Sequence, residues 1–322
     1  MSTPIDLISP SAIPAATSLS RDYIEHFGFT AALDAIKEAH ASYGSGDRPI
    51  NVRIQGVSGV GKTSAFAVYA KRHPMRKNSN GTVVPVVLVS VPAQPTSKVV
   101  YTNILRSLGA NEPGSGTAEN QRARIVMLFK ACRVELLLID EVQHFIDRGT
   151  ARSHAAVADA LKSLLDELDI PCVLGGAPRS SKLFDLNNQL RNRFTRVVAL
   201  RPFDGTTEEG LLPLLGFLAA LLDSVDERIK SFLLDPQVAQ RLFYATDGVP
   251  RLIVDFLLQF RKQVSSYNHQ PSLETASDVF RKVFWMTAPE DRDPFSISFF
   301  ASRLTGLGEP YCPDSQDGDN HA

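Results

Sequence analysis

The sequence lacks the marks of secreted, membrane-spanning and disulfide-stabilised proteins. Only 3 cysteines occur, far apart and without CxxC spacing, so neither a structural zinc site nor a disulfide framework is expected. A reducing cytoplasm is the expected compartment. The N-terminus has no basic region followed by an apolar core and a cleavage site, so we expect no signal peptide. The longest apolar run, residues 211–222, contains Pro213 and Gly216 and falls short of the roughly 20 residues that a membrane helix needs; it predicts a buried helix.

The chain also has no excess of either charge, with 34 Lys and Arg against 35 Asp and Glu. Its charges are nevertheless unevenly placed, because residues 287–322 hold seven acidic residues and only two arginines. The remainder is therefore mildly basic, which is compatible with a DNA-binding surface. Apolar residues make up 43% and charged residues 21%, as in ordinary globular proteins. A disordered or collagen-like chain is excluded.

The length of 322 residues favours about two domains. Apolar β-branched segments alternate with segments of helical spacing up to Pro202, which predicts an α/β fold with a parallel sheet. Residues 207–285 then show helical spacing alone. The expected strands are 50–55, 82–91, 135–139, 171–175 and 197–200, and the expected helices between them include 21–42, 62–72, 97–108 and 119–132.

Four segments follow from this pattern. Residues 1–48 are expected to form an arm and a helix, and residues 49–203 an α/β core with a five-stranded parallel sheet. Residues 204–286 are expected to form a small helical domain. Residues 287–322 are predicted to be an acidic, flexible tail whose end, residues 310–322, is disordered.

A phosphate-binding motif follows the first predicted strand. Residues 56–63, Gly-Val-Ser-Gly-Val-Gly-Lys-Thr, match G-x-x-x-x-G-K-[ST] in full and open a helix, which is the context that the motif requires. Lys62 is expected to reach the β- and γ-phosphates, and Thr63 to ligate Mg²⁺. The residues expected to bind the nucleotide are Gly56, Val57, Ser58, Gly59, Val60, Gly61, Lys62, Thr63, Ser64 and Asp140.

Two acids end a strongly apolar strand, Leu136-Leu137-Leu138-Ile139-Asp140-Glu141. Asp140 is expected in the Mg²⁺ shell together with Thr63. Glu141 is placed to polarise an attacking water, which favours an ATPase over a small GTPase. The sequence also has no N-K-x-D motif to read guanine and no LSGGQ-like signature. We therefore expect ATP and Mg²⁺ as cofactors, and a transporter-type ATPase is disfavoured.

These residues resemble the AAA+ superfamily, and within it the transposition ATPases of the TniB and TnsC type. The segments that carry the resemblance are 56–63, 138–145 (Leu-Ile-Asp-Glu-Val-Gln-His-Phe) and 190–194 (Leu-Arg-Asn-Arg-Phe), and it covers roughly residues 21–260. It implies an AAA+ P-loop core followed by a helical lid domain. It also implies ATP-dependent rings or helical filaments, with six or seven subunits per turn, on double-stranded DNA in the bacterial nucleoid. Such assemblies link a target-selector protein to a transposase.

The resemblance also implies roles for three arginines. Arg191 and Arg193 occupy the position of arginine fingers, of which Arg193 is slightly favoured, and such a finger reaches the nucleotide of a neighbouring subunit. Arg251, after Pro250 at the start of a helix, matches the second sensor of the lid. The alternative for each is a solvated surface arginine.

One position departs from the family pattern. AAA+ proteins usually carry a polar first sensor after the fourth strand, where this chain has Ala177. Arg179 or Ser180 are possible substitutes, and the departure argues for slow intrinsic hydrolysis that is stimulated by a partner. Gln143 and His144 follow the two acids; His144 is expected either to act as a switch or subunit contact or simply to pack.

The expected DNA contacts are sequence-independent contacts to the backbone. One candidate set lies at a helix start, where hydroxyl groups and backbone N–H groups suit phosphates: Thr96, Ser97 and Lys98. The second set, Arg148 and Arg152, follows the two acids. The alternative is that all are ordinary solvated residues.

The leading hypothesis is a transposition regulator that coats target DNA, recruits or activates a transposase, and is disassembled by ATP hydrolysis. An initiator or loader ATPase of replication or repair is the first alternative. A signalling switch that does not bind DNA is the second. The predicted segment after the lid is shorter than the DNA-reading domain that initiators usually append, which disfavours the first alternative.

Overall fold

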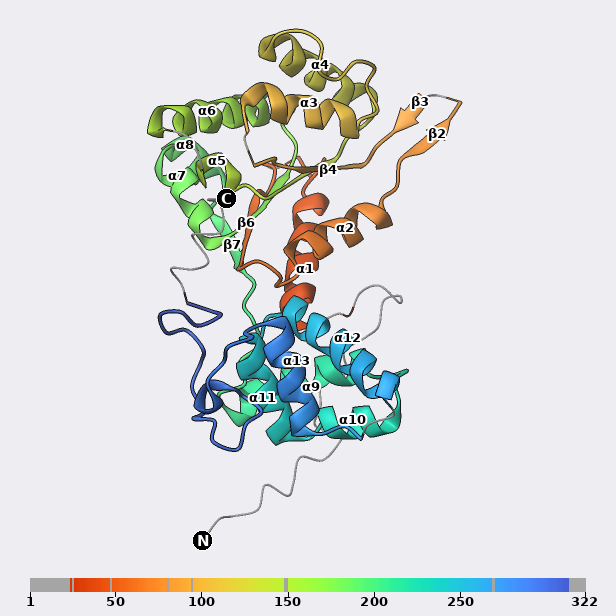
Figure 1. Cartoon of the computed structure of the whole chain (residues 1–322). Coiled ribbons are helices and arrows are strands. Elements are labelled where there is room, and N and C mark those ends of the chain that lie inside the picture. Colours follow the sequence, from red (N-terminus) through yellow and green to blue (C-terminus); the bar gives the residue numbers. More distant parts are fainter. Residues whose placement is uncertain are drawn as a thin grey trace. The chain divides into compact units, whose positions relative to one another are not determined.

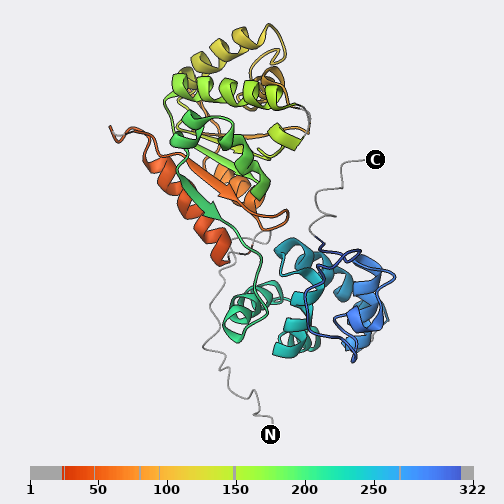
Figure 2. The same cartoon turned by 90° about the vertical axis from the view of Figure 1, so that its left-hand side faces the viewer.

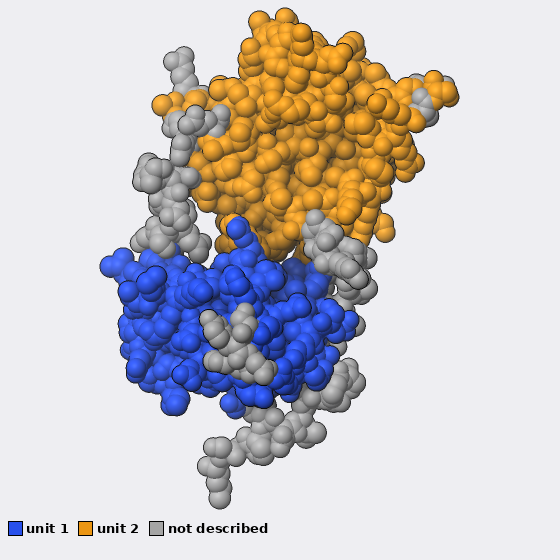
Figure 3. Space-filling model, turned by 45° about the vertical axis from the view of Figure 1, so that its right-hand side comes forward, with its two compact units in different colours: residues 1–27, 202–322 blue, residues 28–201 orange. Residues whose placement is uncertain are grey.

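The computed structural model describes residues 24, 26–46, 48–79, 81–93, 95–147, 150–267 and 270–312. The expected N-terminal arm, the end of the acidic tail and Arg148 lie outside the described residues. The chain divides into two compact units, one of residues 28–201 and one of residues 1–27 with 202–322 (Figure 3).

The larger unit is built on a five-stranded sheet with the order β4-β5-β6-β1-β7 (Figure 1). Every pairing in this sheet is parallel, so the predicted five-stranded parallel sheet is confirmed. The strands are β1 (Val52–Gln55), β4 (Val86–Ser90), β5 (Leu136–Asp140), β6 (Cys172–Gly176) and β7 (Arg196–Ala199).

Helices cover both faces of this sheet. Leu137 and Ile139 of β5 share one core cluster with α3 (Ser97–Ser107), α4 (Ala118–Ala131) and α6 (Ala151–Leu168). Leu136 and Leu138 are equally buried and point to the opposite face, where α2 (Lys62–Arg72) contacts β4, β5 and β6. Burial on both faces explains why β5 is an unbroken apolar run.

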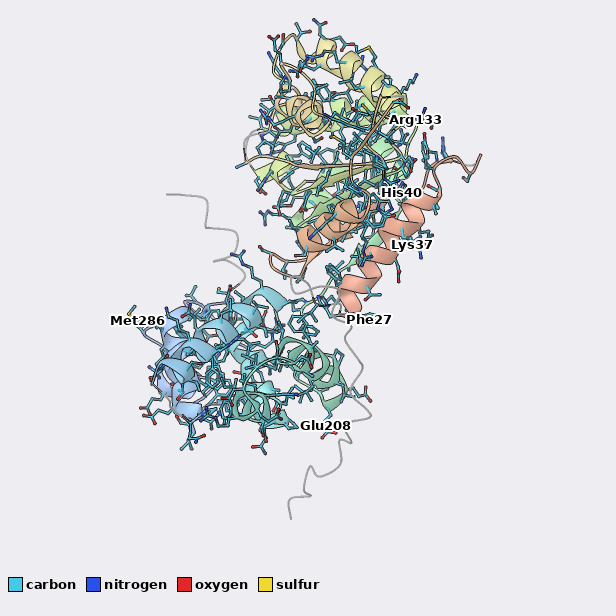
Figure 4. The ribbon with its side chains drawn as sticks, turned by 90° about the vertical axis from the view of Figure 1, so that its right-hand side faces the viewer. Phe27, Lys37, His40, Arg133, Glu208 and Met286 are labelled. Carbon is cyan, nitrogen blue, oxygen red and sulfur yellow. The ribbon has the colours of Figure 1, made fainter. Side chains whose placement is uncertain are left out.

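Helix α1 (Phe27–Ala41) lies along the α2 side of the sheet (Figure 2). His40, near its C-terminal end (Figure 4), joins three parts of the unit. Its Nδ1 lies 3.0 Å from the Tyr69 hydroxyl of α2, and its Nε2 lies 2.9 Å from the Glu135 carboxylate before β5. The sequence predicts that this helix begins at about residue 21, whereas in the structure it begins at Phe27.

The strand expected over residues 82–91 is wrong as a single element. Its first part, β3 (Gly81–Val83), pairs antiparallel with β2 (Arg76–Asn78) in a separate hairpin, and only β4 joins the main sheet. Pro85 stands between the two parts and has no N–H to continue a ladder. Its carbonyl instead accepts from the backbone N–H groups of Glu135 and Leu136.

Short helices follow the ends of β5 and β6. The first of them lie at the carboxyl edge of the sheet, and the last, which precedes β7, leads back to the opposite edge. They are α5 (His144–Asp147), η2 (Pro178–Ser181), α7 (Lys182–Asp185) and α8 (Asn188–Arg193).

The described residues of the smaller unit between 208 and 283 form five helices joined by short turns, as the spacing predicts. The apolar run 211–222 lies in α9, whose Leu214 and Leu218 are fully buried. Ile24, from the start of the chain, also packs against this core. No helix in the described part of the chain is long and apolar enough to cross a membrane. The helices are α9 (Glu208–Leu221), α10 (Glu227–Leu233), α11 (Pro236–Thr246), α12 (Pro250–Tyr267) and α13 (Leu273–Val283).

The expectation of a flexible tail is wrong for residues 288–312. Phe295, Leu304 and Tyr311 are buried in the core of the smaller unit. The fully buried Asp293 carboxylate accepts from Arg281 Nε at 2.8 Å and Ser277 Oγ at 2.6 Å. The apolar anchors are spaced irregularly among polar residues, so neither helical nor strand periodicity reveals them.

Truncating one of these anchors tests the packing. Phe295→Ala is expected to lower the free energy of unfolding by about 3 to 5 kcal/mol, because it leaves a cavity where a whole ring was buried. Ile297→Ala removes a side chain that is 97% exposed in the same segment and is expected to change it by less than about 0.5 kcal/mol. Urea unfolding followed by circular dichroism measures both, and equal effects would contradict the packed segment.

Candidate functional site

The loop between β1 and α2 needs glycine at several positions. Gly59 and Gly61 have φ values of 84° and 103°, in the left-handed region that other residues disfavour. A Cβ on Gly56 would lie 2.5 Å from the Leu200 carbonyl oxygen. The loop therefore curls tightly and ends at Gly61, the N-cap of α2, where free N–H groups favour an anion.

Lys62 is buried beneath this loop. Its ammonium group donates to the carbonyl oxygens of Gly56 at 2.7 Å and Val57 at 2.9 Å. Burial lowers the pKa of Lys62, while the charges of Asp140 and Glu141 oppose that shift. The cation is thus held where phosphate oxygens would meet the loop.

Thr63 and Asp140 meet although they are 77 residues apart. The Thr63 hydroxyl donates to Asp140 Oδ2 at 2.6 Å. Burial raises the pKa of Asp140, and hydrogen bonds from Thr63 and from the Glu141 backbone oppose that rise. A hydroxyl and a carboxylate beside a phosphate loop fit Mg²⁺, which takes one or two protein oxygens and completes its shell with water and phosphate.

Two glycines at the end of β6 make room for this arrangement. A Cβ on Gly175 would lie 2.8 Å from Asp140 Oδ1 and from the Phe66 ring. A Cβ on Gly176 would lie 2.8 Å from Val142 and 3.0 Å from Gln143 Oε1. Sequence reasoning missed both, although a Gly-Gly pair at a strand end is itself a sign of close packing.

Glu141 has an unusual backbone and a restrained side chain. Its φ is 61°, a costly conformation for a residue with a Cβ. Its carboxylate accepts a hydrogen bond from Gln143 Nε2, and Gln143 Oε1 accepts from the Ala177 backbone N–H at 3.0 Å. The buried Gln143 amide therefore links Glu141 to the position where a polar first sensor was missing.

His144 and Arg179, which lie near Gln143 and Ala177 in the sequence, also make contacts within the larger unit. His144 Nδ1 lies 2.8 Å from the Val91 carbonyl oxygen, and its Nε2 lies 3.9 Å from the Glu141 carboxylate. Arg179 pairs with Asp147 through contacts of 2.7 and 3.1 Å, and Ser180 is buried.

The two arginines of α8 differ sharply. Arg193 donates to the Asp166 carboxylate and, at 2.9 Å, to the Leu165 carbonyl of α6. Arg191 is exposed, and its side chain has no hydrogen bond or ion pair with any described residue. Arg193 also lines a pocket of about 750 Å³ with Arg48 and Lys162. This pocket lies where β1 and β7 begin, at the edge of the sheet opposite the phosphate loop.

The remaining candidates are spread over both units. Arg251 begins α12 in the smaller unit, and its side chain is 71% exposed and 3.9 Å from Asp255. Thr96 caps α3 by accepting from the Val99 N–H at 3.2 Å, and Lys98 beside it is exposed. Arg152 lies in the first turn of α6.

Solved structures share this architecture at low sequence identity. The Aeropyrum pernix ORC2 protein, in ADPNP and ADP complexes, is 16% identical with a TM-score of 0.59, over 82% of this chain and 70% of that one. CDC6P from Pyrobaculum aerophilum is 14% identical with a TM-score of 0.59, over 88% and 75%. The Aeropyrum pernix ORC1 protein in complex with DNA is 17% identical with a TM-score of 0.53, over 81% and 65%. These likenesses establish the fold alone, that of AAA+ ATPases.

At the level of sequence, no curated protein matches this chain. The family model for the bacterial TniB protein does match, over residues 17–203. That span covers more than half of the chain and includes the phosphate loop, the Asp140-Glu141 pair and both α8 arginines. The chain therefore belongs to the bacterial TniB family and has the AAA+ fold.

Proposed function

We propose that this chain is an ATP-hydrolysing regulator of DNA transposition that oligomerises on double-stranded DNA and recruits or activates a transposase. The observation that carries the proposal is the meeting of Lys62, Thr63, Asp140 and Glu141 at one edge of the sheet in a member of the TniB family. In this proposal residues 49–203 are the nucleotide-binding core, residues 204–286 are the lid, and the protein works in the cytoplasm.

Different residues of the chain bind the phosphates, hold the cation and activate the attacking water. Bound MgATP supplies the γ-phosphoryl group and the cation that neutralises its charge. Lys62 and the N-terminus of α2 bind the phosphate oxygens, and Thr63 and Asp140 hold the cation. Glu141, whose carboxylate is one-third exposed, accepts a proton from the attacking water.

Two substitutions separate binding from hydrolysis. Lys62→Ala is expected to weaken ATP binding by more than about tenfold, because it removes a charged partner of the phosphates. Glu141→Gln is expected to keep ATP binding and lower kcat by about 10² to 10⁴, the usual contribution of a general base. Fluorescent-nucleotide titration and phosphate release measure the two effects. Parental hydrolysis by Glu141→Gln would show that the assigned base is wrong.

DNA assembly is the second part of the proposal. It is supported by the exposed Lys98 at the start of α3 and by the DNA complex of the structurally similar ORC1 protein. The likeness to ORC and CDC6 proteins equally favours an initiator or loader, the second candidate function. Electron microscopy of Glu141→Gln with ATP and DNA distinguishes the two: continuous filaments support the transposition proposal, and isolated particles favour the loader.

Gln143 is a positioning residue for Glu141 in this proposal. Its amide contacts the carboxylate on one side and the Ala177 N–H on the other, so it fixes the carboxylate relative to β6. It thereby supplies a polar group beside Ala177, where this chain lacks the polar first sensor of the family pattern. Any partner that shifts Gln143 would also move the base, which fits an ATPase that is stimulated by its transposase.

A matched pair of glutamines tests this role. Gln143→Ala is expected to lower kcat by about 10- to 100-fold, because misplacing a catalytic group has effects of that size, with ATP affinity unchanged. Gln121 is equally buried and donates to Thr102 Oγ1 and the Pro113 carbonyl at 3.0 Å. Gln121→Ala is therefore expected to reduce stability without changing kcat. Equal kcat values for the two variants would rule out positioning by Gln143.

Arg191 is the better candidate for the arginine finger. Arg193 is held by Asp166 within its own subunit, whereas Arg191 is exposed and unpaired among the described residues. Both precede β7, and therefore lie at the edge of the sheet opposite their own phosphate loop. An arginine there serves the nucleotide of a second subunit, so the active site is shared. Arg251 is the proposed second sensor, and Arg251→Ala is expected to weaken ATP binding.

Subunit mixing tests the shared site. Arg191→Ala is expected to lower kcat by about 10³, the lower end of arginine-finger effects. Glu141→Gln is expected to be inactive because it lacks the proposed general base. Mixing the two should restore part of the hydrolysis, because Glu141→Gln subunits still present Arg191 to intact sites. Arg193→Ala, the matched control, should lower stability instead. A mixture as inactive as its components would contradict a finger supplied by the neighbour.

A further inference from the structure

One part of the chain is cationic without any opposing charge. From Arg48 through Asn111 the sequence contains nine Lys and Arg residues, Arg48 included, and no Asp or Glu, although the whole chain has a net charge of −1. Four of the nine fall within seven residues, Lys71, Arg72, Arg76 and Lys77. They occupy the last turn of α2 and the first strand of the β2–β3 hairpin. We call residues 71–83 the basic hairpin.

The basic hairpin extends away from the rest of its unit. Figure 1 shows β2 and β3 projecting beyond the sheet and its helices, and the same projection is visible in Figure 3. Its strands pair only with each other, with Arg76 opposite Val83. The hairpin therefore adds no strand to the main sheet, and extending that sheet is not its role.

Its cations are exposed, and three of them have no partner. Lys71, Arg76 and Lys77 are exposed, and their side chains form no hydrogen bond or ion pair with any described residue. Elsewhere the chain pairs its arginines readily. Carboxylates within hydrogen-bonding distance are found for Arg122, Arg179, Arg193, Arg196, Arg228, Arg281, Arg292 and Arg303. Unopposed cations on a projection raise the local positive potential and attract a polyanion.

We propose that the basic hairpin binds the phosphate backbone of double-stranded DNA, at a site separate from the start of α3. This inference rests on the proposed DNA-binding function and adds a contact surface to it. Lys71, Arg76 and Lys77 each neutralise a phosphate, and contacts of this kind carry no sequence preference.

The chemistry of the hairpin favours DNA over the other polyanions. Its described tip residues are Lys77, Ser79, Gly81 and Thr82, with no aromatic or large aliphatic side chain, and Met75 before β2 is 46% exposed. Strong binding to a membrane surface combines cations with a larger apolar face that enters the lipid, and hot spots of protein interfaces are enriched in Trp and Tyr as well as Arg. A two-stranded ribbon with polar and cationic side chains has the dimensions of a DNA groove.

The topology allows both surfaces to meet one duplex. The hairpin precedes β4, whereas Thr96 and Lys98 follow it, so the two surfaces lie at opposite ends of that strand. β4 is the edge strand of the sheet, and a strand of its length spans about 17 Å. A duplex lying along this edge would contact the hairpin at one end of β4 and Lys98 at the other.

The test compares two triple variants of the full-length chain. Lys71→Gln/Arg76→Gln/Lys77→Gln removes the three unpaired cations of the hairpin. The control, Lys37→Gln/Lys130→Gln/Lys262→Gln, removes three exposed lysines elsewhere, one of them on α1 (Figure 4). Fluorescence anisotropy with a duplex of arbitrary sequence and a non-hydrolysable ATP analogue measures affinity as a function of salt. Nucleotide binding and thermal unfolding verify that both variants are folded.

The measurements test the hairpin proposal and the proposed DNA-binding function separately. The hairpin variant is expected to bind DNA about 10- to 100-fold more weakly at moderate salt. Its plot of log K against log salt should be shallower by about 2 to 3, because each lost phosphate contact contributes about 0.9. Wild-type and control affinities should agree. If wild type binds DNA and the hairpin variant binds equally well, the hairpin proposal is overturned while the proposed function stands. If wild type binds no DNA, both fail. Loss of binding only to anionic phosphatidylserine vesicles would also overturn the hairpin proposal.

Discussion

The hydrogen bond between the Thr63 hydroxyl and the Asp140 carboxylate is the contact on which the site depends. It joins the end of β5 to the loop after β1, although β6 lies between these two strands in the sheet. The contact needs Gly175 near the end of β6, because a side chain there would collide with Asp140 and Phe66. The phosphate loop, the cation ligands and the proposed base thus depend on one residue that itself touches no ligand.

A second connection runs from the base outward. Glu141 keeps a left-handed backbone, and its carboxylate is held by Gln143, which in turn is fixed by the backbone after β6. His144 joins the same region to Val91, at the end of β4. The candidate DNA contacts of α3 follow Val91 within a few residues. The proposed base is therefore connected to the start of α3, a proposed DNA surface, by one hydrogen bond and a short stretch of chain.

The sequence predicts the parts of this site that local chemistry determines. The phosphate loop is one contiguous segment, and its glycines are needed for the local backbone conformation. The apolar run before Asp140 identifies a strand that is buried on both faces. The pairing of Arg193 with Asp166 and the Gln143 bridge depend on residues that only folding brings together, so no spacing rule reveals them. Pro85 could have divided the strand expected at 82–91, because proline breaks a ladder. The packing of residues 288–312 has no periodic signal.

The smaller unit gathers residues from both ends of the chain. Its core includes Ile24 near the start and Tyr311 near the end, while the larger unit is one continuous segment, residues 28–201. During synthesis on the ribosome, domains generally fold as their residues emerge. The nucleotide-binding unit can therefore fold while translation continues, whereas the helical unit cannot complete its core until Tyr311 has been synthesised. The apolar helices of that unit are made before the last residues that cover them.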